Sequence, residues 1–194
     1  MIRINPRMRR RPYAAILWTI LVLAVLALIA LAAVAWSGGY DIGADAPHTR
    51  PVFWYLQTVR DRSIAAHARG VQPPADLMSE ARVLKGAGLY AGMCTGCHLA
   101  PGMAPTEMAQ GLYPQAPRLA RGTDLSPAEE FWVIKHGVKL TAMPAWGKTH
   151  SDPLIWDMVA FLQRLPHLSP AQYKAIVASA PADHDEIMKD ATGG

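Results

Sequence analysis

The only two cysteines of this 194-residue chain stand close together and are followed directly by a histidine. In the segment Cys94-Thr95-Gly96-Cys97-His98 the thiols lie about one helical turn apart, and the imidazole comes next. This C-x-x-C-H spacing is typical of covalent haem attachment, in which both sulfurs add to vinyl groups of the porphyrin and the histidine binds the iron. We therefore predict one covalent haem c, held by Cys94, Cys97 and His98.

Two other kinds of site use similar residues. A thioredoxin-like redox pair would follow a strand within a βαβ unit, whereas the residues before Cys94 favour a helix. A zinc site formed by Cys94, Cys97 and His98 would need a fourth ligand, and the chain has no second cysteine pair. A colourless protein, produced together with a competent haem-attachment system, would favour one of these alternatives.

The residues around the motif resemble a known family. Gly86-x3-Tyr90-x3-Cys94-x2-Cys97-His98 resembles the first helix of class I cytochromes c, particularly the small domains of cbb3-type oxidase subunit III. The resemblance covers about residues 76–166, just under half of the chain. It implies an all-α fold of the class I cytochrome c type.

In that family the first and last helices of the domain cross closely at a glycine that lies beside an aromatic residue. Gly86 and Tyr90 occupy these places here, and the matching last helix is predicted at residues 152–165. The resemblance makes Trp156 and Phe161 the candidate aromatic partners on that last helix.

The second axial ligand of the iron is predicted from the same resemblance. Gly137 suits a helix C-terminus, and the Met143-Pro144 pair that follows looks like the family's ligand loop. We therefore predict His98 and Met143 as the two iron ligands, a pair that raises the reduction potential relative to two histidines. Met103 lies only five residues after His98, too short a segment to swing around the haem edge.

The other methionines and histidines have plainer interpretations. His136 could form a bis-histidine site, but its place at a helix end suits a solvent-facing or propionate-facing residue. A lone methionine is more often a core filler than a ligand, and a lone histidine outside any motif is most simply a surface residue. These interpretations apply to Met78, Met93, Met108 and Met158, and to His48, His67, His150, His167 and His184.

The Pro117-Arg118-Leu119 segment resembles the Pro-x-Leu segment of the family. The resemblance implies that the Pro117 carbonyl accepts a hydrogen bond from the proximal imidazole and that Leu119 packs on the haem. Such a bond fixes the orientation of the ring and raises its basicity. The connection at residues 99–116 departs in detail from shorter relatives.

A membrane anchor is predicted near the N-terminus. Residues 14–36 form an apolar run broken only by Thr19, and crossing the hydrocarbon core takes about 20 such residues. Five arginines precede the run, which predicts a cytoplasmic N-terminus and a periplasmic haem domain on a bacterial inner membrane. A cleaved signal peptide, with Ala33-Val34-Ala35 as its cleavage site, is the alternative, although its apolar stretch would be unusually long.

The positive charge of the chain is concentrated in those five arginines. The formal net charge is +4, but removing them leaves 14 of the 19 basic residues against 15 acidic ones. The rest of the chain has no basic stripe, and we expect no nucleic acid among its partners.

The chain is predicted to have five parts. They are a cytoplasmic basic stub at residues 1–12, a transmembrane anchor at 13–37, an exported linker at 38–75, the monohaem cytochrome c domain at 76–167, and a short helix with a tail at 168–194. Within and beside the domain, helices are expected at about 76–91, 127–136, 152–165 and 170–178. The first of these has apolar or small residues at Leu77, Ala81, Leu84 and Gly88.

The linker contains a further expected helix at residues 51–68. Phe53, Trp54 and Tyr55 make it more apolar than a free linker requires, and other apolar residues follow helical spacing at Val52, Leu56 and Val59. This helix could lie on the membrane, pack on the haem domain, or contact another subunit. On a membrane, Arg60, Arg62 and Arg69 could face anionic headgroups.

Together these observations predict an electron-transfer protein rather than an enzyme. The chain has no nucleotide fingerprint, no second haem motif and no nucleophile–base signature. We expect a membrane-tethered carrier, or a subunit of a respiratory or periplasmic complex, that exchanges electrons with a quinol-linked complex, a dehydrogenase, an oxidase or a soluble carrier. The alternative is a haem protein with an open sixth position, which is peroxidase-like or binds gases.

Overall fold

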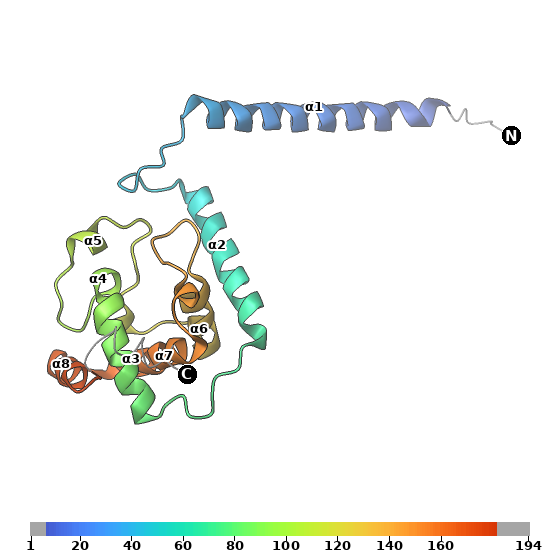
Figure 1. The fold of residues 1–194 in the computed structure, drawn as a ribbon. Coiled ribbons are helices and arrows are strands. Elements are labelled where there is room, and N and C mark those ends of the chain that lie inside the picture. Colours follow the sequence, from blue (N-terminus) through green and yellow to red (C-terminus); the bar gives the residue numbers. More distant parts are fainter. Residues whose placement is uncertain (1–6, 182–194) are drawn as a thin grey trace. The chain divides into compact units, whose positions relative to one another are not determined.

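The computed structural model describes residues 7–181, with side chains from Tyr13 onward. Part of the predicted basic stub, at residues 1–6, and most of the predicted tail, at residues 182–194 with His184, lie outside the described residues. The chain separates into two units, Met1–Ala46 and Pro47–Gly194. The described residues form helices joined by turns and contain no strand, which confirms the all-α prediction (Figure 1).

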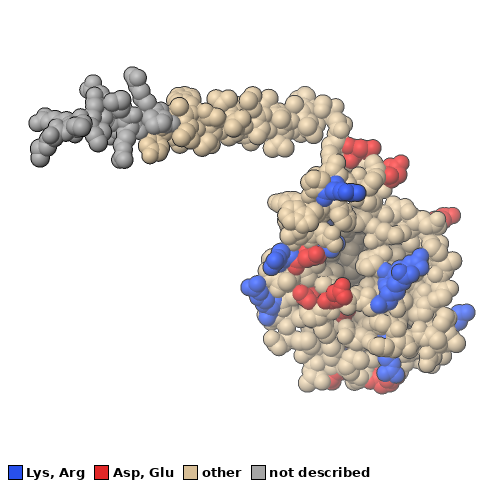
Figure 2. Space-filling view, turned by 180° about the vertical axis from the view of Figure 1, so that it is seen from behind, with Lys and Arg blue, Asp and Glu red and all other residues tan. Residues whose placement is uncertain are grey.

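The first unit contains one long helix, α1, at Arg7–Ser37. Its apolar part, Tyr13–Ser37, is 25 residues long with a mean hydropathy of 2.9, and none of it is buried. Figure 2 shows no Lys, Arg, Asp or Glu side chain along this part. By length and composition it is the helix, among the described residues, that could cross a membrane.

The second unit contains the remaining helices, and four of them lie within one residue of the predicted ranges. These four are α2 (Arg50–His67), α6 (Pro127–His136), α7 (Asp152–Arg164) and α8 (Pro170–Ala178). The others are α3 (Glu80–Met93), α4 (Thr95–His98) and α5 (Glu107–Gln110), with short 3-10 turns η1 (Ala68–Gly70), η2 (Leu119–Arg121), η3 (Trp146–Lys148) and η4 (Leu165–His167).

The core of this unit is the crossing of α3 and α7. A Cβ atom on Gly86 would lie 1.9 Å from the carbonyl oxygen of Asp157, so only glycine permits the approach. The ring centroids of Tyr90 and Phe161 are 5.4 Å apart beside the crossing. Phe161 is therefore the aromatic partner of Tyr90, whereas Trp156 stacks on Phe131 at 4.2 Å.

The start and the buried face of α3 differ from the prediction. The helix begins at Glu80 because residues 74–79 form turns, in which the N–H of Leu77 and Ser79 bond to carbonyls three residues back. The residues it buries are Val83, Gly86, Ala87, Leu89 and Tyr90, whereas Ala81 is exposed and Leu84 and Gly88 are half-buried. The close contact at Gly86 turns this face toward α7, which helical spacing alone does not indicate.

The start of α6 is fixed by a capping box. The Ser126 hydroxyl accepts a bond from the N–H of Glu129, and the Glu129 carboxylate accepts one from the N–H of Ser126 at 2.8 Å. Pro127 occupies the first turn, where no N–H is needed. These contacts set where α6 begins, and Gly137 follows at its end.

Of the three positions considered for α2, packing on the haem domain is observed. Ile64 is buried, and the ring of His67 lies 5.4 Å from that of Trp132 in α6. The N-terminal half of α2 is less covered, since Val52 and Leu56 are half-buried and Val59 is exposed.

Candidate functional site

The C-x-x-C-H segment continues α3 as the single turn α4. The N–H of Cys94 bonds to the carbonyl of Tyr90 at 2.9 Å, and the N–H of His98 bonds to the carbonyl of Cys94 at 2.8 Å. The two cysteines do not form a disulfide with each other. Burial, with a smaller contribution from Cys97, raises the pKa of the Cys94 thiol to about 12, which does not suit the low-pKa thiolate of a thioredoxin-like redox pair.

The chain reverses sharply after this turn at Leu99. Its φ of 61° and ψ of 172° lie in a region normally taken by glycine. Two contacts offset the strain: the Leu99 side chain is buried, and its carbonyl accepts a hydrogen bond from the Tyr90 hydroxyl at 2.5 Å. The helix that carries the thiols therefore also holds the segment that leaves them.

The imidazole of His98 is oriented by the backbone of Pro117. Nδ1 of His98 lies 2.7 Å from the Pro117 carbonyl oxygen. Because a carbonyl can only accept, Nδ1 carries the proton and Nε2 keeps its lone pair for a metal. Burial lowers the pKa of His98, while the bond to Pro117 raises it, and the net lowering favours the neutral ring that metal binding requires.

Met143 lies on the loop between α6 and η3, and this loop folds back over Gly137. Gly137 has a φ of +66°, and a Cβ atom there would lie 2.7 Å from the Met143 carbonyl oxygen and from the Pro144 carbonyl carbon. The N–H of Val138 bonds to the Met143 carbonyl at 3.2 Å, and the N–H of Met143 bonds to the Thr141 hydroxyl at 3.1 Å. The glycine thus allows the loop to close, and two hydrogen bonds hold Met143 in place.

One largely apolar cavity brings together five of the six predicted site residues: Cys94, Cys97, His98, Leu119 and Met143. The sixth, Pro117, lies outside its lining and touches His98. Two thiols, an imidazole and a thioether in an apolar enclosure fit the donor set and the surroundings that haem c needs. The residues present therefore fit the predicted cofactor.

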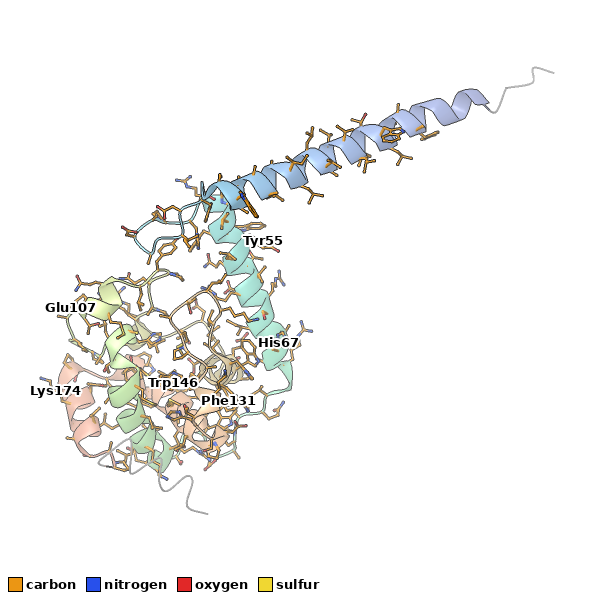
Figure 3. All side chains as sticks on the ribbon, turned by 45° about the horizontal axis from the view of Figure 1, so that its top comes forward. Tyr55, His67, Glu107, Phe131, Trp146 and Lys174 are labelled. Carbon is orange, nitrogen blue, oxygen red and sulfur yellow. The ribbon has the colours of Figure 1, made fainter. Side chains whose placement is uncertain are left out.

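Sequence reasoning missed most of the cavity wall. The further lining residues are Tyr90, Met93, Ile134, Ala142, Pro144, Trp146, Met158 and Leu162. Trp146, labelled in Figure 3, lies two residues after the Met143-Pro144 pair, and this short distance in the sequence could have indicated that it lines the cavity. Ile134 and Leu162 come from α6 and α7, and nothing in helical spacing singles them out from other core residues.

The structure places the methionines differently from the sequence interpretation of them as core fillers. Met93 and Met158 also line the cavity, each from a helix, while Met143 is the lining methionine on a loop. Met78 and Met108 are exposed, so interpreting them as core fillers was wrong. Met103 lines a different groove, which is formed by residues 98–104 together with Arg118, Ala120 and Arg121.

Met108 makes a contact that the sequence did not indicate. Its sulfur lies 3.3 Å from the Cys97 sulfur, although its side chain is exposed. It belongs to α5, which is held against the motif because the Thr106 hydroxyl bonds to the Gly96 carbonyl. The segment at 99–116 departs from shorter relatives, which left no pattern from which α5 could be predicted.

Among the described residues, the histidines outside the motif do not line the cavity. His136 is exposed at the end of α6, with its ring 5.0 Å from that of Trp132. His150 is buried, which corrects its interpretation as a surface residue; its ring lies edge-on to Trp146 at 5.3 Å. Within the part of the chain that the structure describes, no group of three or more His, Cys, Asp or Glu side chains is placed to hold a metal.

Comparison with protein families gives a match at residues 81–162 to the family described as cytochrome c oxidase, cbb3-type, subunit III. The matched segment runs from α3 to α7 and includes all six predicted site residues. Neither the curated proteins nor the solved structures gave a match. The family match confirms the resemblance found in the sequence.

Proposed function

We propose that this chain is a membrane-tethered electron-transfer protein with one haem c bound by His98 and Met143, because residues 81–162 match the cbb3-type subunit III family. The family match supports the general activity, which is electron transfer by covalently attached haem c. The tether, the number of haems, the axial ligands and the partners are the proposed part.

The observation that carries the proposal is the composition of the cavity. Cys94, Cys97, His98 and Met143 come from two segments far apart in the chain, yet all four line it. The haem iron, when bound, takes up and releases one electron. The protein supplies the attachment through Cys94 and Cys97, and the axial donors through His98 and Met143.

Other residues position these groups and keep water out. The Pro117 carbonyl holds the His98 ring in one orientation, and the bonds to Val138 and Thr141 hold Met143. Apolar side chains such as Ile134 and Leu162 enclose the cavity. A ligand set that is already in place needs little rearrangement on electron transfer, which is what a carrier requires.

The proposed tether is α1, whose apolar part is long enough to cross a bilayer. The arginines before it favour a cytoplasmic N-terminus, so the haem domain would lie in the periplasm of a bacterial cell. A subunit III domain suggests a partner within a redox complex, with a quinol-linked complex or dehydrogenase as donor and an oxidase or soluble carrier as acceptor. We propose no catalytic reaction for the chain itself.

Mass and optical measurements on the purified full chain test the haem and its ligands. We expect the polypeptide mass plus one covalent porphyrin, low-spin six-coordinate bands, and no CO binding by the native ferrous protein. High-spin bands with rapid CO binding would instead support an open sixth position and a peroxidase-like or gas-binding role. A chain with no added macrocycle would overturn the proposal entirely.

Membrane extraction tests the tether and the partners. We expect haem protein to remain in membranes washed with alkaline carbonate, and to be digested by protease added from the periplasmic side. Release by carbonate would show that α1 is not a retained anchor, as a cleaved signal peptide predicts. Purification in mild detergent would then distinguish a carrier, recovered alone, from a subunit recovered with redox partners.

A further inference from the structure

The helix α2 has two faces with different surroundings. Its inner face is fixed to the folded domain through Ile64, which is 5% exposed, and through the contact between His67 and Trp132. Its N-terminal half carries an outer aromatic face, which we define as Trp54, Tyr55 and Val59. These side chains are 67%, 61% and 48% exposed.

An exposed apolar patch of this kind marks a contact with something outside the folded domain. Two exposed aromatic residues and a valine on one side of a helix are more than the scattered apolar residues of an ordinary surface. Figure 3 labels Tyr55 and His67 at the two ends of α2, so the outer aromatic face lies away from the end that packs on α6.

We infer that the outer aromatic face of α2 rests in the headgroup region of a lipid bilayer, so that α2 is a surface-bound membrane helix. This inference rests on the proposed function, because it requires that α1 is a retained anchor. It adds a second membrane contact that belongs to the haem domain.

The length of the connection places α2 within reach of the membrane. Only residues 38–49 separate the end of α1 from the start of α2. Fully extended at 3.3–3.6 Å per residue, they span roughly 40 Å at most. A short flexible tether gives an effective concentration on the order of millimolar, so even weak partitioning into the interface is enough to hold α2 there.

The residue types suit lipid headgroups. Trp and Tyr have an apolar ring with a polar group at one end, and they are enriched where membranes meet water. Arg50 and Arg62 are exposed on the same helix and can contact phosphate groups. The only acidic residue of α2, Asp61, is neutralised by Arg60 at 2.8 Å. A helix with an aromatic face and surplus arginine is typical of an interfacial helix.

The consequence for function is a restricted orientation of the haem domain. Because Ile64 of α2 is buried and the His67–Trp132 contact joins α2 to α6, the domain cannot rotate freely about a membrane-bound α2. The cavity lining includes Ile134, which also lies in α6. Resting α2 on the bilayer therefore limits the directions from which a partner approaches the cavity.

Site-specific photo-crosslinking in native membranes tests this inference on the full, haem-loaded chain. Tyr55 is replaced by p-benzoylphenylalanine in one variant, and the exposed Lys174 of α8 is replaced in a control variant. After illumination, the adducts are identified by mass. We expect phospholipid adducts at position 55 at a yield at least about tenfold higher than at position 174.

Two results would overturn the inference. Adducts at position 55 that contain another protein would assign the face to a subunit contact, and equal lipid yields at both positions would show that α2 stays in solution. A carbonate wash of the same membranes separates the two levels of failure. Release of the haem protein would overturn the tether and the α2 contact together, whereas retention without lipid adducts at position 55 would overturn the α2 contact alone.

Discussion

The two sides of the cavity are built in different ways. The attachment turn, residues 94–98, is helical and extends α3, so its backbone bonds run back along α3 and the His98 ring has a further bond to Pro117. The methionine loop, residues 138–145, is irregular and closes on itself around Gly137. One side thus presents the proposed attachment groups on a helix, whereas the other presents the proposed sixth ligand on an irregular loop.

This difference suggests a division of tasks between the two sides. In the proposed site, covalent bonds from Cys94 and Cys97 would prevent loss of the haem. The proposed ligand Met143 would instead be held in place by the fold of its own loop. We therefore expect a substitution in the helix crossing that supports both sides to abolish the site. A substitution in the methionine loop should alter only the sixth coordination position.

The largest effect is expected from Gly86→Ala, because the helix crossing lies beneath both sides. The new methyl group would lie 1.9 Å from the carbonyl oxygen of Asp157, a backbone atom that moves only if α7 moves. We expect the free energy of unfolding to fall by about 3 kcal/mol, and haem attachment to fall with it. Denaturant unfolding followed by haem absorbance measures both.

Gly70→Ala is the matched control for this change, since a Cβ atom there has no neighbour within 4 Å. It should leave the stability and the haem content unchanged. If both variants were equally stable, the close crossing of α3 and α7 would not be what supports the cavity.

The next largest effect is expected from Met143→Ala, which separates the two sides. The variant should keep its covalent haem, because Cys94 and Cys97 are untouched. Its reduction potential should fall and its ferrous form should bind CO, because the thioether ligand is gone. Mass measurement, redox titration and CO difference spectra provide the three readouts.

The control for Met143→Ala is Met158→Leu, which changes a methionine on the wall of the same cavity. Leucine conserves the volume, so this variant should lose less than about 1.5 kcal/mol and show no CO binding. CO binding by Met158→Leu and none by Met143→Ala would assign the ligand to α7 instead of the methionine loop.

A smaller and more selective effect is expected from Gly137→Ala. The φ of +66° disfavours a side chain, and the new Cβ atom would lie within 2.8 Å of backbone atoms of Met143, Pro144 and Ala145. We expect a loss of about 2 kcal/mol in stability and partial CO binding, with covalent haem retained. Gly111→Ala, where the nearest neighbours lie 3.7 Å away or more, is the control and should show no CO binding.

The sequence made the attachment turn predictable because its chemistry lies in five consecutive residues. The helices α6 and α8 were equally predictable from the sequence, because Ser126-Pro127 and Ser169-Pro170 mark their first turns through local capping. Such signals depend on neighbours in the chain, which a sequence shows directly. Their prediction therefore did not require knowledge of the packing.

The features that escaped prediction depend on neighbours in space. Helical spacing showed that α3 has an apolar face, but the contact of Gly86 with Asp157 decides which residues are buried. The same limitation applies to Met158, which helical spacing cannot distinguish from an ordinary core methionine, and to Met108, whose contact with Cys97 depends on the fold of α5. In each case a residue more than ten positions away supplies the missing information.

The smallest expected effect concerns a network that ties the two sides together. Thr123 comes shortly after η2 in the segment that begins with Pro117. Its hydroxyl donates a hydrogen bond of 2.6 Å to the carboxylate of Glu130 in α6, and α6 leads to the methionine loop. Gln163 donates a second bond to the same carboxylate at 2.6 Å. Burial raises the pKa of Glu130 above its ordinary value of 4.5, and the two hydrogen bonds only partly oppose this.

Glu130→Gln should therefore stabilise the protein at neutral pH, whereas the same change at the neighbouring Glu129 should not. A raised pKa means that the stability from Glu130 is fully present below pH 4.5 and is lost as the pH rises through its higher folded pKa. Removing the charge should increase stability at neutral pH by on the order of 1 kcal/mol. Bonds from the N–H and the hydroxyl of Ser126 lower the pKa of Glu129, so its contribution is present above pH 4.5 and is lost as the pH falls through its lower folded pKa.

Denaturant unfolding of both variants and the native chain, from about pH 4 to pH 8, checks the two signs. The curve for Glu130→Gln should lie above that of the native chain at neutral pH and converge with it in acid. The curve for Glu129→Gln should lie below at neutral pH and also converge in acid. Two curves displaced in the same direction would mean that net charge, which both variants change equally, dominates over the opposite surroundings of these adjacent carboxylates.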